Sequence, residues 1–159
     1  MILASALGAA GFIWWVLALI TAVFPARRPA AWRLLLALIF TFVISDYALK
    51  PIFDRPRPFD SIPALVVVDA RPRTPSFPSG HAAMAMAGAI AGARMLPLTA
   101  WVLWPLAVVV AISRVYVGVH WPSDVIAGAA VGAACAWFVL GGRLCYKPII
   151  HSPDVIRPG

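Results

Sequence analysis

Long apolar stretches separated by short polar segments dominate the chain. Five of them approach the roughly 20 residues that a helix needs to cross the hydrocarbon core of a bilayer. These stretches run from about Ile2 to Phe24, Ala31 to Leu49, Ser79 to Leu96, Leu98 to Val117 and Pro122 to Leu140. The first stretch lacks the basic start of a signal peptide, and it is longer than the apolar segment of a signal peptide. The pattern therefore predicts an all-α fold, a polytopic membrane bundle of about five transmembrane helices.

One long connection, residues 51–77, lies between the second and third predicted helices. Its prolines exclude a continuous helix and predict an extended loop; they are Pro51, Pro56, Pro58, Pro63, Pro72 and Pro75. The apolar run Leu65–Val68 inside it fits a short strand, a lid or a loop anchor, and we favour the anchor. The 159 residues leave room for one bundle, so we expect a single integral-membrane domain over residues 1–159.

Composition agrees with a membrane protein. Hydrophobic residues make up 62% of the chain, charged residues 12%, and the mean hydropathy is +0.89. The net charge of +7 is compatible with a nucleic-acid partner. The basic residues, however, are scattered between apolar stretches and do not form a soluble basic surface with interleaved aromatic residues. We therefore expect no nucleic acid and interpret the cations as topology signals and ligands for phosphate.

Three polar clusters interrupt the apolar pattern at the ends of predicted helices. Lys50 ends the second helix, His81 opens the third, Arg114 ends the fourth and Asp124 opens the fifth. In a bundle whose helices alternate in direction, all four positions lie on one face of the membrane. The sequence thus predicts that the clusters meet in one site, with residues 51–77 on the same face.

The distribution of Lys and Arg predicts which face this is. The opposite face carries Arg27, Arg28, Arg33, Arg94, Arg143, Lys147 and Arg157, whereas the site face carries Lys50, Arg55, Arg57, Arg71, Arg73 and Arg114. Three of the second group are candidate ligands, so the excess of basic topology signals falls on the opposite face. We expect the N-terminus and the site outside, on the periplasmic face of a bacterial inner membrane, and the C-terminus inside.

The cations of the clusters suit a phosphate ester. Fixed charges on Lys50, Arg57 and Arg114 can stabilise the oxygens that become equatorial in an in-line displacement at phosphorus. Any one of them alone is better explained as a residue that snorkels to the interface, but three on one face favour phosphate binding. Asp46, four residues before Lys50, is interpreted as a structural partner of Lys50 or of a loop arginine.

The two histidine clusters supply candidate chemistry. Ser79 can cap a helix whose free N–H groups face an anion, Gly80 permits close approach, and His81 can then transfer protons. A neutral His120 can attack phosphorus if Asp124 fixes its tautomer. The alternative for each cluster is a plain helix cap beside an unrelated histidine. No cluster has the composition of a metal site, so we expect no metal and no cofactor.

These residues also carry a family resemblance. Lys50-x6-Arg57-Pro58, Pro78-Ser79-Gly80-His81 and Ser113-Arg114-x5-His120-x3-Asp124 resemble the three-part signature of the type 2 phosphatidic acid phosphatase superfamily, which includes vanadium-dependent haloperoxidases. The match covers residues 50–124, without a departure at any signature position. Many membrane members have six helices, whereas this sequence predicts five.

The resemblance implies a metal-independent hydrolase of membrane lipids that forms a phosphohistidine. It assigns His120 as nucleophile, Asp124 as its orienting partner and His81 as acid and base, with phosphate held by Lys50, Arg57, Ser79, Gly80 and Arg114. A polyprenyl diphosphate, phosphatidic acid or phosphatidylglycerophosphate type of lipid is the expected substrate. Two rivals stay open, a soluble haloperoxidase, which the hydropathy disfavours, and a non-enzymatic lipid-phosphate binder or transporter. The sequence predicts no oligomeric state.

Overall fold

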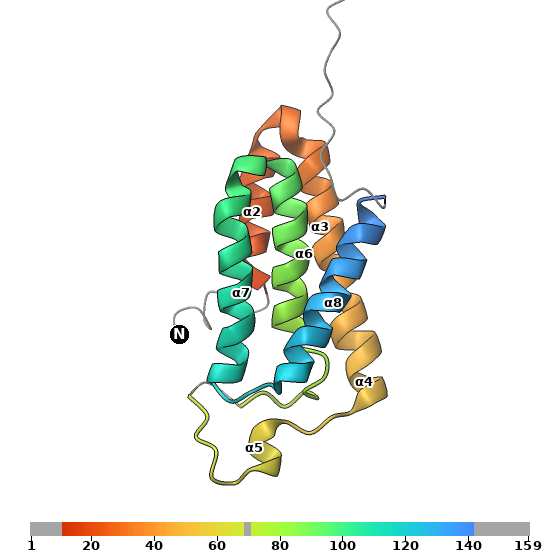
Figure 1. Cartoon of the computed structure of the whole chain (residues 1–159). Coiled ribbons are helices and arrows are strands. Elements are labelled where there is room, and N and C mark those ends of the chain that lie inside the picture. The colour runs from red at the N-terminus through yellow and green to blue at the C-terminus, as the bar shows by residue number, and fades with distance from the viewer. Residues whose placement is uncertain (1–10, 69–70, 142–159) are drawn as a thin grey trace, which may run out of the picture.

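A bundle of five long helices forms the part of the molecule that the structure describes (Figure 1). The computed structural model describes residues 11–68 and 71–141. The long helices are α2 (Phe12–Val23), α3 (Arg28–Phe42), α6 (Gly80–Met95), α7 (Ala100–Tyr116) and α8 (Pro122–Val139). Short helices α4 (Lys50–Phe53) and α5 (Pro58–Ser61), 3₁₀ turns Pro25–Arg27 and Pro97–Thr99 and a π-helical segment Val43–Leu49 complete the regular structure of the described residues. The predicted all-helical bundle is confirmed.

Within the described ranges, three helical segments are long and apolar enough to cross a membrane, namely Pro25–Ser61, Pro97–Tyr116 and Pro122–Val139. The described part of the first helix is shorter, and residues 2–10 of its predicted range lie outside the described residues. Helix α6 has 16 residues and is the most buried element, since α3, α7 and α8 all pack against it.

Small residues allow this central packing. Almost every residue of α6 between Ala82 and Gly92 is buried, and most are alanine or glycine. A Cβ added at Gly132 of α8 would lie 2.1 Å from the Ala83 carbonyl oxygen, so the two helix backbones are in direct contact there. Large apolar side chains such as Leu98 and Ile126 point outward, 89% and 71% exposed. Their exposure suits a surface that faces lipid.

The second predicted helix continues past its expected end at Leu49, through Pro51, to Phe53. The π-helical turn precedes Pro51, and in it the Lys50 N–H bonds to the carbonyl of Ser45, five residues earlier. Proline has no N–H to donate, and a widened turn absorbs the resulting break in the hydrogen-bond ladder. The same turn brings Asp46 and Lys50 together at the end of the bundle.

The connection 51–77 lies across one end of the bundle, together with the starts of α6 and α8 and the end of α7 (Figure 1). The Leu65–Val68 run is extended but forms no strand, and Leu65 and the backbone of Val66 lie against Gly118 in the turn between α7 and α8. The opposite end carries Arg27, Arg28, Arg33 and Arg94, while Arg143, Lys147 and Arg157 lie outside the described residues.

Candidate active site

A cavity of about 220 Å³ lies at the loop end of the bundle, where the three polar clusters meet. Six of the eight predicted site residues line it, namely Lys50, Arg57, Gly80, His81, Arg114 and His120. The others stand behind this wall: Ser79 and Asp124 are completely buried. Phe42 and Met84 add an apolar side to the cavity, deeper in the bundle. The predicted meeting of helix ends on one face is therefore present in the structure.

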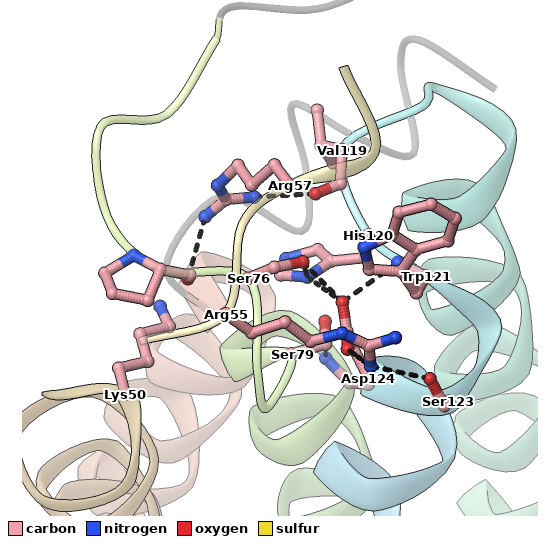
Figure 2. Close-up of polar contacts among 12 residues, drawn as sticks. Lys50, Arg55, Arg57, Ser76, Ser79, Val119, His120, Trp121, Ser123 and Asp124 are labelled. Carbon is pink, nitrogen blue, oxygen red and sulfur yellow. Dashed lines mark hydrogen bonds and ion pairs between the residues drawn. The ribbon is translucent and has the colours of Figure 1, made fainter. Parts of the chain in front are cut away.

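Arg57 is buried among neutral oxygens. Its Nη1 donates to the Val119 carbonyl at 2.8 Å (Figure 2). Its Nε donates to the Thr74 carbonyl at 2.8 Å, and Nη2 donates to Thr74 Oγ1 at 3.2 Å and to the Pro75 carbonyl at 3.3 Å. These bonds fix the guanidinium plane without a carboxylate on it. Since neutral acceptors do not cancel the charge, Arg57 presents a full positive charge to the cavity.

Lys50 approaches the cavity from the end of the α3–α4 helix. Its Nζ forms a close ion pair with Asp46 Oδ1, and Asp46 Oδ2 accepts a bond from Ser45 Oγ at 2.7 Å. A Cβ added at Gly80 would lie 2.6 Å from Asp46 Oδ2. Gly80 therefore provides the space that this carboxylate occupies beside the start of α6. The predicted structural pairing of Asp46 with Lys50 is present.

The start of α6 carries the predicted capping residue. Ser79 has extended backbone angles, and its Oγ accepts a bond from the Ala82 N–H at 3.4 Å. The Ser79 N–H donates to the Asp124 carbonyl oxygen at 2.9 Å, which joins the starts of α6 and α8. His81 follows in the first turn and lines the cavity. Because Ser79 Oγ accepts this bond, Ser79 caps the first turn of α6.

Arg114 lies at the end of α7 and is 3% exposed. Its Nε and Nη2 both lie 3.2 Å from the hydroxyl oxygen of Ser113. The Arg114 carbonyl accepts the N–H groups of Val119 and His120, each at 3.3 Å, and so ties the turn that carries His120 to the end of α7. One residue thus contributes a cation to the cavity wall and holds the nucleophile candidate's backbone.

His120 and Asp124 face each other across the start of α8. The distance from His120 Nδ1 to Asp124 Oδ2 is 3.6 Å, just beyond hydrogen-bond length, and Ser76 Oγ lies 3.5 Å from the same nitrogen. With Nδ1 turned toward these oxygens, Nε2 is the nitrogen left for the cavity. Burial, helped by Arg57 and Lys50, lowers the pKa of His120 against the opposing effect of Asp124. A neutral imidazole, the form that can attack phosphorus, is therefore favoured.

Asp124 has more partners than the sequence predicted. Its Oδ1 accepts a bond from Arg55 Nη1 at 2.7 Å, while Oδ2 accepts the Trp121 N–H at 2.9 Å and a very short bond from Ser76 Oγ (Figure 2). Sequence reasoning missed Arg55 and Ser76 as site residues. Their only signal was their position, since Arg55 lies inside the first signature motif, between Lys50 and Arg57, and Ser76 lies two residues before the second motif, which begins at Pro78.

Charge in the cavity wall is predominantly positive. Lys50, Arg57 and Arg114 contribute three cations, and among the described lining residues Asp46, which pairs with Lys50, contributes the one carboxylate. Within residues 11–68 and 71–141, no three His, Cys, Asp or Glu side chains gather closely enough to hold a metal ion. Such a wall suits an anion with several oxygens, and the paired histidines suit proton transfer or nucleophilic attack.

Known proteins with related sequences include two enzymes of polyprenyl lipids. The chain is 32% identical over 123 residues to an undecaprenyl-diphosphatase of Sulfolobus acidocaldarius, covering 77% of this chain and 59% of that protein. It is 37% identical over 135 residues to a decaprenylphosphoryl-5-phosphoribose phosphatase of Mycobacterium tuberculosis, covering 82% and 73%. The chain thus spans little more than half of the first relative's length.

Solved structures with the same arrangement of helices include LpxE and a transmembrane phosphatase of PAP2 type. LpxE of Aquifex aeolicus superimposes with a TM-score of 0.75 at 28% identity, over 88% of this chain and 84% of that chain. A PAP2-type phosphatidylglycerolphosphate phosphatase of Bacillus subtilis gives a TM-score of 0.66 at 29% identity, over 87% and 72%. The family model of the PAP2 superfamily matches residues 30–143, a range that includes every residue named above as lining the cavity. The chain therefore belongs to the PAP2 superfamily.

Proposed function

We propose that this chain is a membrane lipid phosphatase that hydrolyses a lipid phosphate or diphosphate through a phosphohistidine on His120. The observation that carries the proposal is the cavity itself. Three buried cations and His120 line it, and the Nδ1 of His120 faces the buried carboxylate of Asp124. Membership of the PAP2 superfamily and the phosphatases and diphosphatase named among its relatives support the same reaction.

The walls of the cavity indicate how a lipid would lie. Phe42 and Met84 form an apolar side deeper in the bundle, and Arg57, Thr74 and His120 form a polar side toward the loop. A lipid would place its phosphate among the cations and its tail along the apolar side. A polyprenyl diphosphate, phosphatidic acid or phosphatidylglycerophosphate type of substrate has this shape, and three relatives are named for polyprenyl or glycerol lipid phosphates.

In the proposed first step, His120 Nε2 attacks phosphorus in line with the ester oxygen that leaves. Lys50, Arg57 and Arg114 hold the three equatorial oxygens, and the P–O bond to the lipid breaks as the N–P bond forms. His81, as the imidazolium, gives its proton to the departing oxygen. The phosphate dianion provides the negative charge that stabilises an imidazolium among three cations.

In the second step, His81 takes a proton from water, whose oxygen attacks the phosphohistidine. The N–P bond breaks, inorganic phosphate leaves, and His120 returns to its neutral form while His81 is again protonated. Asp124 stays ionised and faces the Nδ1–H of His120 throughout, and its negative charge stabilises the positive ring of the intermediate. No step needs a metal or another cofactor.

For the location, we propose a bacterial inner membrane with the cavity on the periplasmic face. The basic residues at the other end, Arg27, Arg28, Arg33 and Arg94, support this orientation, since Lys and Arg accumulate on the cytoplasmic side.

The test is a panel of lipid phosphates in detergent and in liposomes, assayed for released inorganic phosphate with EDTA present. We expect release from at least one lipid, its loss in His120→Ala, and inhibition by vanadate. Leu98→Ala, at an 89% exposed position near the opposite end, is the matched control and should keep wild-type activity. Full release by His120→Ala would refute the mechanism. Lipid binding without release by the wild-type chain would instead indicate a binder or transporter.

A further inference from the structure

Two residues from opposite ends of the 51–77 connection reach the carboxylate behind the nucleophile. Arg55 lies near the first end and Ser76 near the second, and the Ser76 N–H bonds to the Arg55 carbonyl at 2.8 Å. Their side chains donate hydrogen bonds to different oxygens of Asp124, Arg55 to Oδ1 and Ser76 to Oδ2 (Figure 2). Neither residue lines the cavity that holds the predicted phosphate ligands.

We propose that Arg55 and Ser76 are positioning residues for His120, acting through Asp124. The inference rests on the proposed function and concerns the geometry of its nucleophile. Asp124 is completely buried, and a buried carboxylate is stable as an anion only when its oxygens are paired. Arg55 provides the charge, and Ser76 and the Trp121 N–H provide further donors.

The hydroxyl of Ser76 also reaches the nucleophile. Ser76 Oγ donates its hydrogen bond to Asp124 Oδ2. The lone pairs of the Ser76 oxygen therefore remain available to the Nδ1–H of His120, at 3.5 Å. Asp124 Oδ2 lies at 3.6 Å from the same nitrogen, so carboxylate and hydroxyl together form the acceptor for Nδ1. This arrangement selects the tautomer in which Nε2 carries the lone pair.

Packing fixes Arg55 although its side chain is 37% exposed. The guanidinium lies 5.5 Å from the centre of the Trp121 ring, and the Trp121 indole N–H donates to the Pro56 carbonyl at 3.1 Å. Nη1 also reaches Ser123 Oγ at 2.8 Å. Lysine cannot reproduce both the stacking and the fork of hydrogen bonds, but it retains the charge.

Kinetics of purified, full-length protein on the best lipid of the panel test this role. In Arg55→Gln we expect kcat to fall about tenfold to hundredfold, the loss that a small misplacement of a reacting group causes. KM should stay within about twofold, because Arg55 does not touch the substrate cavity. Removal of Arg55 leaves the charge of Asp124 uncompensated beside His120, so the acidic limb of kcat/KM should move to higher pH.

Comparison variants separate positioning from general effects. Arg55→Lys should restore the position of the acidic limb and part of kcat, and Ser76→Ala should also lower kcat with little change in KM. Arg73→Gln removes the same charge from an exposed position of the same connection and should behave as wild type. If Arg55→Gln fails to fold in detergent, Arg55→Lys and Ser76→Ala still decide the question.

Three results would overturn the inference. The first is a wild-type kcat in both Arg55→Gln and Ser76→Ala. The second is a lower kcat in both variants with an unmoved acidic limb and no rescue by Arg55→Lys. The third is an effect of Arg73→Gln equal to that of Arg55→Gln. A wild-type chain that releases no phosphate from any lipid would refute the proposed function instead, so the two failures are distinguishable.

Discussion

Replacing Gly128 with alanine should disable the site while the bundle stays folded. Gly128 lies one turn after Asp124 in α8, and an added Cβ would be 2.3 Å from the Ser79 carbonyl oxygen and 3.2 Å from the Ser79 nitrogen. Ordinary van der Waals contact begins at 3.4 Å. Backbone atoms cannot rotate away as a side chain can, so the start of α6 must move from α8 by about 1 Å.

Two opposing energies decide the effect on stability. Overpacking of this kind costs about 1–3 kcal/mol, whereas alanine is favoured over glycine inside a helix by about 1 kcal/mol. The net loss is therefore about 0–2 kcal/mol, small enough for the chain to remain folded. Activity is more sensitive, because the Ser79 N–H bonds to the Asp124 carbonyl and His81 lies two residues further along. A shift of about 1 Å between His81 and Asp124 should lower kcat about a hundredfold.

Phosphate release and thermal unfolding in the same detergent measure the two quantities. Gly92→Ala is the matched control, since its Cβ would meet only the ends of Leu103 and Leu17 side chains, at 2.7 Å and 3.2 Å, toward the opposite end of α6. It gains the same helix propensity and should keep its activity. Wild-type kcat in Gly128→Ala, or an equal loss in Gly92→Ala, would refute the argument that close backbone contact aligns the site.

Two further predictions concern protonation and orientation. Because burial lowers the pKa of His120 from 6.5, the acidic limb of kcat/KM should lie below pH 6.5 and rise in Arg57→Gln; a wild-type limb above pH 6.5 would contradict this. The unfolded chain takes up the His120 proton first, so the free energy of unfolding should fall as pH drops below 6.5. Ser61 is exposed in α5, and Ser61→Cys in a chain whose cysteines are replaced should react with an impermeant maleimide added to intact cells. Labelling only after lysis would place the site on the cytoplasmic face.

The sequence predicted the helices and the shared position of the clusters because local signals mark helix ends. Ser79 before an apolar run predicts a helix start, and Pro122 fits the first position of α8. The extension of the second helix to Phe53 was not predicted, because proline usually ends a helix and the π-helical turn that accommodates Pro51 has no clear sequence signal. Local pattern thus predicts where helices start more reliably than how an irregular turn prolongs them.

The partners of Asp124 escaped prediction for a different reason. Arg55 and Ser76 are 69 and 48 residues from it, and the connection that carries them has no periodic pattern from which a contact could be inferred. Arg55 and Arg57 also have the same charge and nearly the same place in the sequence, so composition cannot tell their tasks apart. Only the folded connection shows that Arg55, and not Arg57, pairs with the carboxylate of Asp124.

The environments of these two arginines explain how one loop can serve both the substrate and the nucleophile. Arg57 is held by carbonyl and hydroxyl oxygens of Thr74, Pro75 and Val119, so its charge stays available for an anion in the cavity. Arg55 forms an ion pair with Asp124, so its charge is balanced within the protein. The side chain of residue 57 lies on the cavity and that of residue 55 behind the nucleophile, although one proline alone separates them. A loop rich in prolines fits this demand, because its restricted backbone keeps the two guanidinium groups directed to different targets at small entropic cost.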